Sequence, residues 1–247
     1  TLGLPPIEEY KQDKEEVEAQ TQNDESNTNI LSVKTILFEQ VLNNKFVWIL
    51  AISYFFVYIV RTAVNDWTHL YLVYVKGYET VAAATSIFWF EAGGFFGMLV
   101  AGWWTDHLFK GKRVPFMLFC AAGLLATLYV FWKVNFYDIR VDYALMAIAG
   151  FLVFGPQMLV GLAAAEAVNK KASCTANGFV GCWAYAGAAV TGYPLGKIID
   201  YSWDAYFTTL IICCLAIFLV LLPIASERKQ SRFKEEWSAS KPALDEG

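Results

Sequence analysis

The sequence contains few charged residues for its length. Asp, Glu, Lys and Arg make up 17% of the 247 residues, whereas hydrophobic residues make up 57% and the mean hydropathy is +0.40. An ordinary soluble domain has about 25% charged residues. The composition therefore excludes a typical soluble globular domain and indicates an integral membrane protein.

The patterns of catalytic and nucleic-acid-binding proteins are missing as well. We find no catalytic dyad, no glycine-rich phosphate loop after a strand, and no cluster of metal ligands. The basic run KGKR at 110–113 lies in a predicted loop, and it is not the large basic patch that is typical of nucleic-acid binding. We therefore predict a protein that is not an enzyme, holds no cofactor or metal, and has no nucleic-acid partner.

The five cysteines do not have the paired spacing of a zinc site or a disulfide framework. All of them lie in apolar segments, at Cys120, Cys174, Cys182, Cys213 and Cys214. We predict that they are small apolar residues that fill gaps between helices.

Six apolar stretches are long enough to cross a membrane, which needs about 20 residues. They are 46–75, 80–104, 114–134, 141–166, 174–199 and 204–225. Lys and Arg are concentrated after the second, fourth and sixth stretches, and such residues collect on the cytoplasmic side. We therefore predict an all-α membrane protein, a bundle of six transmembrane helices with both termini in the cytoplasm.

The ends of the chain differ from this bundle in composition. Eight acidic residues and two lysines occur in the first 30 residues. We predict that 1–45 is a flexible cytoplasmic connector with a short amphipathic helix, that 46–225 is the bundle, and that 226–247 is a charged cytoplasmic tail. The chain begins without Met or a signal-peptide pattern, so we expect it to be the second part of a longer protein.

Glycines recur in the second, fourth and fifth stretches, which predicts close approach of these helices. Pro156 lies inside the fourth stretch and removes a backbone hydrogen-bond donor, so we expect a kink there.

Arg61 is the most informative residue because it lies inside the apolar run 46–67. Arginine at the centre of a bilayer costs about 2.5 to 3.5 kcal/mol on insertion scales, so it faces a partner or a water-filled cavity. Tyr58 lies three residues earlier on the same helix face. Asp66 and Glu91 are acids in apolar segments. Arg61 either forms a structural ion pair that joins the first two helices or binds an oxyanion, for which the planar guanidinium is well suited.

The segment GWWTDHLFKGKR, residues 102–113, resembles the cytoplasmic loop signature of the major facilitator superfamily. The matching residues are Gly102, Asp106, Gly111, Lys112 and Arg113. The resemblance implies a twelve-helix fold of which this chain is the C-terminal half. It also implies that the aspartate and the basic residues form a charge latch near a cytoplasmic gate.

Further segments resemble the C-terminal half of the organophosphate:phosphate antiporter family. They are YIVRTAVNDW, FWFEAGG, GFLVFGPQMLVGLAAAE, NKKASCTANGFVG and WAYAG, in the same order across 46–225. That family exchanges glycerol 3-phosphate or hexose 6-phosphate for inorganic phosphate. The connector segment GLPPIEEY is most similar to the bacterial hexose-phosphate branch, which contains transporters and a sensor of external glucose 6-phosphate.

The resemblance also implies roles for single residues. Arg61 matches one of the family's two phosphate-binding arginines, and the other belongs to the N-terminal six-helix half. Tyr58 and Tyr185 match tyrosines that line the pore. Asp66 and Glu91 match acids of an interhelical salt-bridge network that takes part in gating.

Two positions depart from the family pattern. Phe154, at the substrate site, stands where glycerol-phosphate exchangers resemble LIYGP, so a hydroxyl is missing. Hexose-phosphate exchangers resemble D-G-x-K where this chain has Asn177 followed by Gly, Phe and Val. These changes imply altered sugar selectivity, or sensing in place of transport.

Three functions follow as expectations. The first is an antiporter in the bacterial inner membrane that exchanges a sugar phosphate, with glucose 6-phosphate foremost, for inorganic phosphate. The second is a receptor of the same fold that signals external hexose phosphate to a membrane sensor kinase. The third is a transporter of another anion, such as a carboxylate.

Overall fold

A computed structural model describes residues 38, 41–107, 113–134, 138–168 and 172–224. The helices are α3 (Lys45–Tyr74), α4 (Thr80–His107), α5 (Val114–Lys133), α6 (Ile139–Glu166), α7 (Ser173–Val190), α8 (Tyr193–Tyr201), α9 (Trp203–Leu221) and the 3-10 helix η3 (Leu222–Ile224). Most of the predicted connector, the predicted tail, Gly111 and Lys112 lie outside the described residues. Within these residues the fold is all-α, as the composition predicted.

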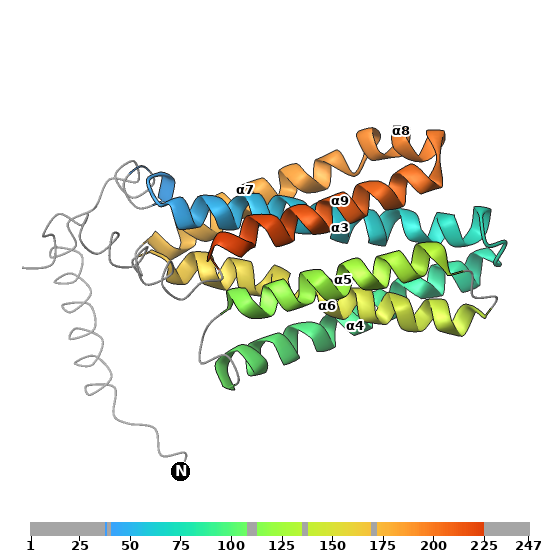
Figure 1. The fold of residues 1–247 in the computed structure, drawn as a ribbon, viewed down its shortest axis with the longest axis horizontal. Coiled ribbons are helices and arrows are strands. Elements are labelled where there is room, and N and C mark those ends of the chain that lie inside the picture. Colours follow the sequence, from blue (N-terminus) through green and yellow to red (C-terminus); the bar gives the residue numbers. More distant parts are fainter. Residues whose placement is uncertain (1–37, 39–40, 108–112, 135–137, 169–171, 225–247) are drawn as a thin grey trace, which may run out of the picture.

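The long helices run up and down along one axis (Figure 1). Five of them, α3, α4, α5, α6 and α9 with η3, are long and apolar enough to cross a membrane. α3 begins and α9 ends at the same end of the bundle, which we call end A, and α3 meets α4 at the opposite end, end B (Figure 1). Both ends of the bundle's chain thus lie at end A, which agrees with an even number of crossings, because α7 and α8 together run from end A to end B (Figure 1).

The predicted single helix 174–199 is wrong, because the chain breaks between α7 and α8. Gly192 has a ψ of −112°, which is not helical. Pro194 follows in the first turn of α8, where it can start a helix but could not continue the previous one. The freed carbonyl of Thr191 accepts a hydrogen bond from the indole of Trp67 at 2.9 Å, so α3 holds the break in place.

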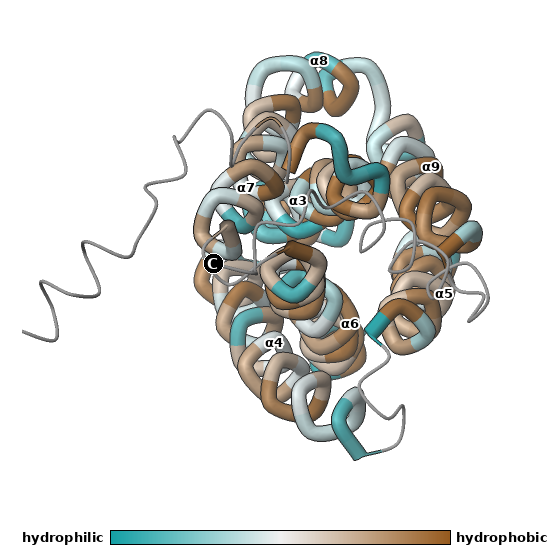
Figure 2. Tube along the Cα trace, turned by 90° about the vertical axis from the view of Figure 1, so that its left-hand side faces the viewer, coloured by the Kyte–Doolittle hydropathy of each residue, from teal (hydrophilic) through white to brown (hydrophobic). Residues whose placement is uncertain are grey.

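The packing follows the pattern of two three-helix repeats. Viewed along the bundle, α3 and α6 lie in the middle, α7 and α4 on one side, and α9 and α5 on the other (Figure 2). α3 packs on α7 and α9, just as α6 packs on α4 and α5. Exchanging α3, α4 and α5 with α6, α7 and α9 therefore turns each of these contacts into the other, as inverted repeats require.

Glycines allow the closest helix contacts, as the sequence predicted. A Cβ added to Gly150 on α6 would lie 2.8 Å from the carbonyl carbon of Phe90 and 3.0 Å from the nitrogen of Gly94, both on α4. A Cβ at Gly187 on α7 would collide with the backbone of Phe55 on α3. The α4–α6 and α3–α7 contacts therefore depend on missing side chains.

The cysteines follow the prediction only in part. Cys120, Cys213 and Cys214 are buried, but Cys174 and Cys182 are exposed on α7. Whether a cysteine of an apolar segment is buried depends on the helix face that it occupies, so composition alone did not reveal that these two are exposed. α6 stays helical through Pro156, and its kink remains a prediction.

Replacing Gly150 by alanine is expected to destabilise the protein by about 3 kcal/mol, because the added Cβ meets backbone atoms that cannot rotate away. Thermal unfolding of the purified protein in detergent measures the effect. Gly178 on α7 is the matched control, since a Cβ there has no atom within 4 Å. The close-contact interpretation is wrong if the two alanine variants have the same stability.

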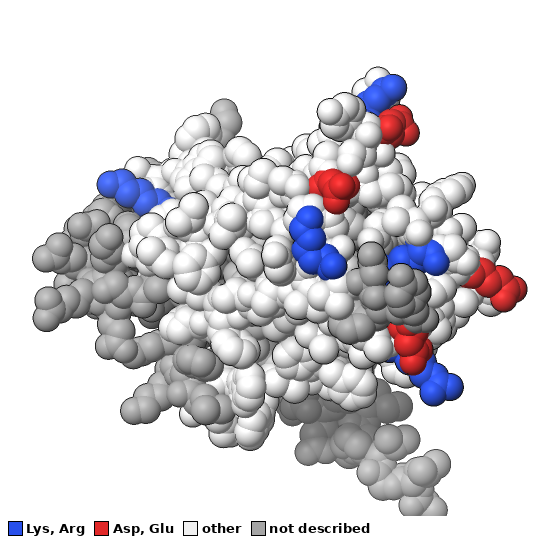
Figure 3. Space-filling view, turned by 45° about the vertical axis from the view of Figure 1, so that its right-hand side comes forward, with Lys and Arg blue, Asp and Glu red and all other residues white. Residues whose placement is uncertain are grey.

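On the face drawn in Figure 3, most of the charged side chains gather toward end B, and one basic side chain lies toward the other end. A broad band without Lys, Arg, Asp or Glu lies between them on the face shown. Such a band is what the hydrocarbon core of a bilayer requires, because an exposed charge there is costly. The bilayer is therefore the environment of this bundle.

Candidate functional site

Arg61 lies near the middle of α3, about 24 Å from its first residue and about 20 Å from its last at 1.5 Å per residue. Its guanidinium carbon is 4.7 Å from the ring centre of Phe154 on α6 and 5.6 Å from that of Tyr58. Its Nε is buried and has no hydrogen-bond partner among the described residues. Aromatic rings thus support the cation, while a donor remains available.

Tyr58 connects Arg61 to two other helices. Its ring centre is 5.8 Å from that of Tyr185 on α7 and 4.9 Å from that of Tyr54. Its hydroxyl accepts a hydrogen bond from Nε2 of Gln157 on α6 at 3.3 Å. The structure therefore brings together the four residues predicted for the substrate site, and we call them, with Tyr54 and Gln157, the Arg61 cluster.

The sequence did not single out Tyr54 and Gln157. A sequence signal existed for both, because Tyr54 lies four residues before Tyr58 and Gln157 lies three after Phe154, at the spacing of neighbours on a helix face.

The ring of Phe154 has a fixed position. Only 5% of the residue is exposed, and its ring centre is 5.5 Å from that of Phe90 on α4. A Cβ at Gly94 would lie 2.7 Å from Cγ of Phe154. The missing side chain at Gly94 thus makes room for the ring beneath Arg61. In contrast, Tyr185 is 71% exposed and forms the open edge of the cluster.

Asp66 and Glu91 are exposed, and within the described residues neither forms an ion pair with Arg61. The carboxylate of Asp66 accepts a hydrogen bond from its neighbour Asn65 at 2.9 Å. The structural ion pair that we considered between the first two helices is therefore not present in the described residues. Arg61 remains available for an anion.

The loop signature lies partly in a helix, in contrast to the prediction. α4 continues to His107, so Gly102 and Asp106 belong to its last turns. Arg113 donates hydrogen bonds from Nε and Nη2 to the carboxylate of Glu166, at the end of α6, at 2.8 and 2.6 Å. These bonds, with a smaller contribution from the charge of Asp106, raise the pKa of Arg113. The bidentate pair joins α5 to α6 at end A.

End B has a second ion pair, which the sequence did not reveal. The Lys76 ammonium contacts the carboxylate of Asp142 in the first turn of α6, with side-chain exposures of 6% and 0%. Tyr78 donates to the same carboxylate at 2.9 Å. Burial and this hydrogen bond raise the pKa of Tyr78 to about 12. The contribution of the protonated Tyr78 hydroxyl to stability is thus complete below pH 10 and is lost as the pH rises toward 12.

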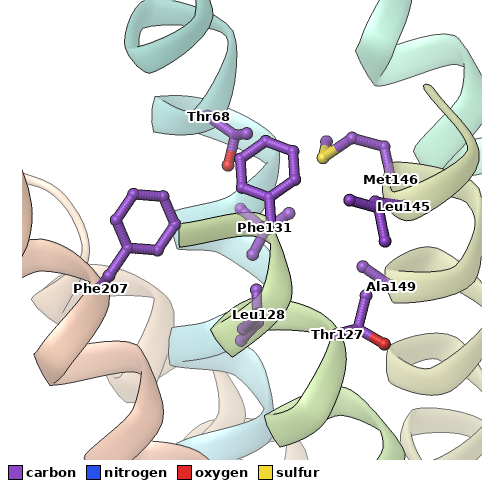
Figure 4. A pocket seen from close by; sticks show the side chains of 9 residues that line it. Thr68, Thr127, Leu128, Phe131, Leu145, Met146, Ala149 and Phe207 are labelled. Carbon is purple, nitrogen blue, oxygen red and sulfur yellow. The ribbon is translucent and has the colours of Figure 1, made fainter. Parts of the chain in front are cut away.

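A small internal cavity lies apart from the Arg61 cluster, between α3, α5, α6 and α9 (Figure 4). Its lining is apolar except for Thr68 and Thr127. The hydroxyl of Thr127 donates to the carbonyl of Gly123 at 2.9 Å, and that of Thr68 lies 3.3 Å from the hydroxyl of Tyr206. The cavity therefore offers no free polar group to an anion, and we interpret it as a packing gap.

Comparison with known proteins identifies the family. A family model of the Major Facilitator Superfamily matches residues 5–191. The chain belongs to the major facilitator superfamily. The all-α fold, the repeat-like packing and the signature at the end of α4 agree with this family.

Three curated relatives show which members of this superfamily the chain is similar to. The chain is 44% identical over 238 residues to a probable hexose phosphate transport protein of Chlamydia trachomatis, covering 94% of this chain and 52% of that protein. It is 43% identical over 223 residues to the membrane sensor protein UhpC of Salmonella typhimurium, covering 90% and 49%. It is 38% identical over 225 residues to a glycerol-3-phosphate transporter of Bacillus subtilis, covering 90% and 50%. The chain thus spans about half the length of these relatives, and the resemblance to this group is confirmed.

Proposed function

We propose that this chain is the C-terminal half of a transporter that exchanges a hexose phosphate, with glucose 6-phosphate foremost, for inorganic phosphate. The observation that carries the proposal is the buried Nε of Arg61, which has no partner among the described residues at mid-depth of α3. An unpaired donor of a charged group is costly to bury, so a site that keeps one suits an anionic ligand. The relatives named for hexose phosphate and glycerol 3-phosphate transport support phosphate as that anion.

In the proposed mechanism, Arg61 and an arginine of the N-terminal half bind the phosphate from two sides. The bound dianion neutralises two like charges and draws the halves together, which lowers the barrier for alternating access. An empty carrier keeps its cations apart and moves slowly, so uptake of one anion requires release of another. Tyr58 and Tyr185 line the path, and Phe154 supports the guanidinium.

The remaining predicted residues serve gating in this proposal. Asp66 and Glu91 are exposed on this half and would pair with cations of the N-terminal half when the two meet. The Arg113–Glu166 pair, with Asp106 beside it, would hold end A of the bundle together as one rigid body. We place end A, both termini and the basic loops in the cytoplasm, with the protein in the bacterial inner membrane.

A receptor for external hexose phosphate that acts on a membrane sensor kinase is the second candidate. The observation that favours it is the similarity to the membrane sensor protein UhpC, at 43% identity. The phenylalanine at 154 and the asparagine at 177 fit this alternative, since each lacks a group that the exchanger pattern has. A sensor would bind hexose phosphate but transport it poorly.

Uptake of labelled glucose 6-phosphate into proteoliposomes that contain the complete protein distinguishes these functions. Uptake is expected with internal phosphate and is expected to fall to background without it. Saturable binding without uptake would contradict the transporter and support the receptor. Inhibition by a dicarboxylate but not by inorganic phosphate would instead favour another anion as the substrate.

A further inference from the structure

Gln157 has a buried amide oxygen, Oε1, without a hydrogen-bond partner among the described residues. The other end of the same amide is held in place, because Nε2 donates to the hydroxyl of Tyr58 at 3.3 Å. Folded proteins pair nearly all their buried polar atoms, since an unpaired atom has lost its hydrogen bonds to water. An oriented but unpaired acceptor therefore suits a ligand that supplies the donor.

Gln157 reaches the Arg61 cluster through the crossing of α3 and α6. Tyr58 and Arg61 are three residues apart on α3, and Phe154 and Gln157 are three apart on α6, so each pair shares one helix face. The guanidinium of Arg61 lies over Phe154, and the amide of Gln157 bonds to Tyr58. An unpaired cationic donor and an unpaired neutral acceptor thus lie next to the same tyrosine ring.

These two groups differ in the ligand atoms that they can bind. A guanidinium N–H needs an acceptor, which a phosphate oxygen provides. An amide oxygen needs a donor, and the phosphate group of a sugar phosphate, an ester with a second pKa of about 6, offers almost none at neutral pH. A sugar hydroxyl can donate. A molecule with a phosphate at one end and hydroxyls toward the other satisfies both groups at once. Inorganic phosphate keeps an O–H as HPO4²⁻, but it has no hydroxyl away from the phosphorus atom that binds at Arg61.

We infer that Oε1 of Gln157 accepts a hydrogen bond from a sugar hydroxyl of the substrate whose phosphate binds at Arg61. Gln157 is then a specificity residue that distinguishes sugar phosphate from inorganic phosphate. The inference rests on the proposed function, because it needs a sugar phosphate in this cluster. A purely structural role is the competing explanation, in which Gln157 only positions Tyr58.

Equilibrium binding of glucose 6-phosphate and of inorganic phosphate to the complete purified protein tests the inference. Gln157→Met keeps the length of the side chain but removes both amide groups. We expect it to weaken glucose 6-phosphate binding about tenfold, the contribution of one neutral hydrogen bond, and to change phosphate binding by less than about twofold. Retained phosphate binding also shows that the variant is folded. Equal losses for both ligands, or no loss for either, would overturn the inference.

Deoxy analogues of glucose 6-phosphate identify the hydroxyl and exclude the structural role. In the wild type, the analogue that lacks the hydroxyl bound by Gln157 should bind about tenfold more weakly. In Gln157→Met, the same analogue should bind as well as glucose 6-phosphate, because the partner has already been removed. If every deoxy analogue binds the wild type like glucose 6-phosphate, the inference is wrong, and this measurement needs no variant that folds.

Tyr58→Phe is the matched control for the competing explanation, in which Gln157 only positions Tyr58. It removes the hydroxyl that holds Nε2 but keeps the amide oxygen Oε1 of Gln157 itself. We expect the deoxy effect to persist in this variant, whereas its loss would assign the selectivity to Tyr58. A wild type that binds glucose 6-phosphate without any effect of the deoxy analogues overturns this inference alone, and a wild type that does not bind glucose 6-phosphate overturns the proposed function.

Discussion

Replacing Arg61 by glutamine is expected to weaken the binding of inorganic phosphate and of glucose 6-phosphate about 100-fold in the complete protein. Removing one partner of a buried charge pair costs about 3 kcal/mol, which corresponds to that factor. Arg61→Lys keeps the charge but loses the bidentate donor geometry, so an intermediate loss of about tenfold is expected. Isothermal titration of the detergent-purified variants measures both effects.

Two features of the structure make this substitution a clear test. The Nε of Arg61 has no partner among the described residues, so its removal breaks no hydrogen bond of Nε within this half and the bundle should still fold. Lys133→Gln is a suitable control, because it removes one positive charge at end B, where Nζ lies 3.4 Å from the ring centre of Trp132. The account of the site is wrong if Arg61→Gln binds phosphate as tightly as Lys133→Gln does.

Replacing Asp142 by alanine is expected to destabilise the bundle by about 3 to 5 kcal/mol. Both members of the Lys76–Asp142 pair are buried, so the change leaves an ammonium without its counterion. The Lys76 ammonium would keep its contacts with two aromatic rings, those of Phe131 and Tyr71, whose centres are 4.7 and 6.0 Å away. It would lose the carboxylate that joins the α3–α4 loop to α6. Thermal unfolding in detergent measures the change.

The double variant Lys76→Met/Asp142→Leu shows whether the lost stability comes from the unpaired Lys76 charge or from the lost packing at this site. It removes both charges and fills the space with apolar side chains, so most of the lost stability should return. If Asp142→Ala is as stable as the wild type, Lys76 can reach water from its position and the pair is not a buried one. A double variant less stable than Asp142→Ala would mean that the charges themselves stabilise this end.

Most of the fold could be predicted because long apolar runs have few alternatives in a bilayer. The one helix predicted incorrectly shows what apolar length alone misses. Gly192 and Pro194 are strong helix breakers, but the surrounding run is apolar enough to suggest one crossing. The carbonyl of Thr191 is then paired with Trp67, a partner 124 residues away, and no local pattern indicates such a contact.

The candidate site was only partly visible in the sequence. Arg61 was identified because a charge within an apolar run is expensive, whereas Phe154 and Tyr185 were identified through the family resemblance. Gln157 was missed because an uncharged polar residue in a membrane helix is inexpensive enough to be unremarkable. Its importance depends on which of its atoms lack a partner, and only the structure gives that information.

The Lys76–Asp142 pair was missed for a different reason. The sequence places Lys76 in a loop and Asp142 at the start of a helix, where a carboxylate favours the helix dipole and is usually exposed. The loop between α3 and α4 folds over the start of α6 and buries both groups. Burial at helix ends depends on tertiary packing, which apolar periodicity does not report.

Reactivity of a cysteine at position 185 tests the central claim most directly. Tyr185 is exposed at the open edge of the Arg61 cluster, so Tyr185→Cys in a complete protein whose native cysteines have been replaced should report access to the site. We predict labelling by a membrane-impermeant thiol reagent applied from either side of the membrane, with protection by both glucose 6-phosphate and inorganic phosphate. Labelling from one side alone, or labelling that neither anion slows, would contradict an alternating-access phosphate site at Arg61.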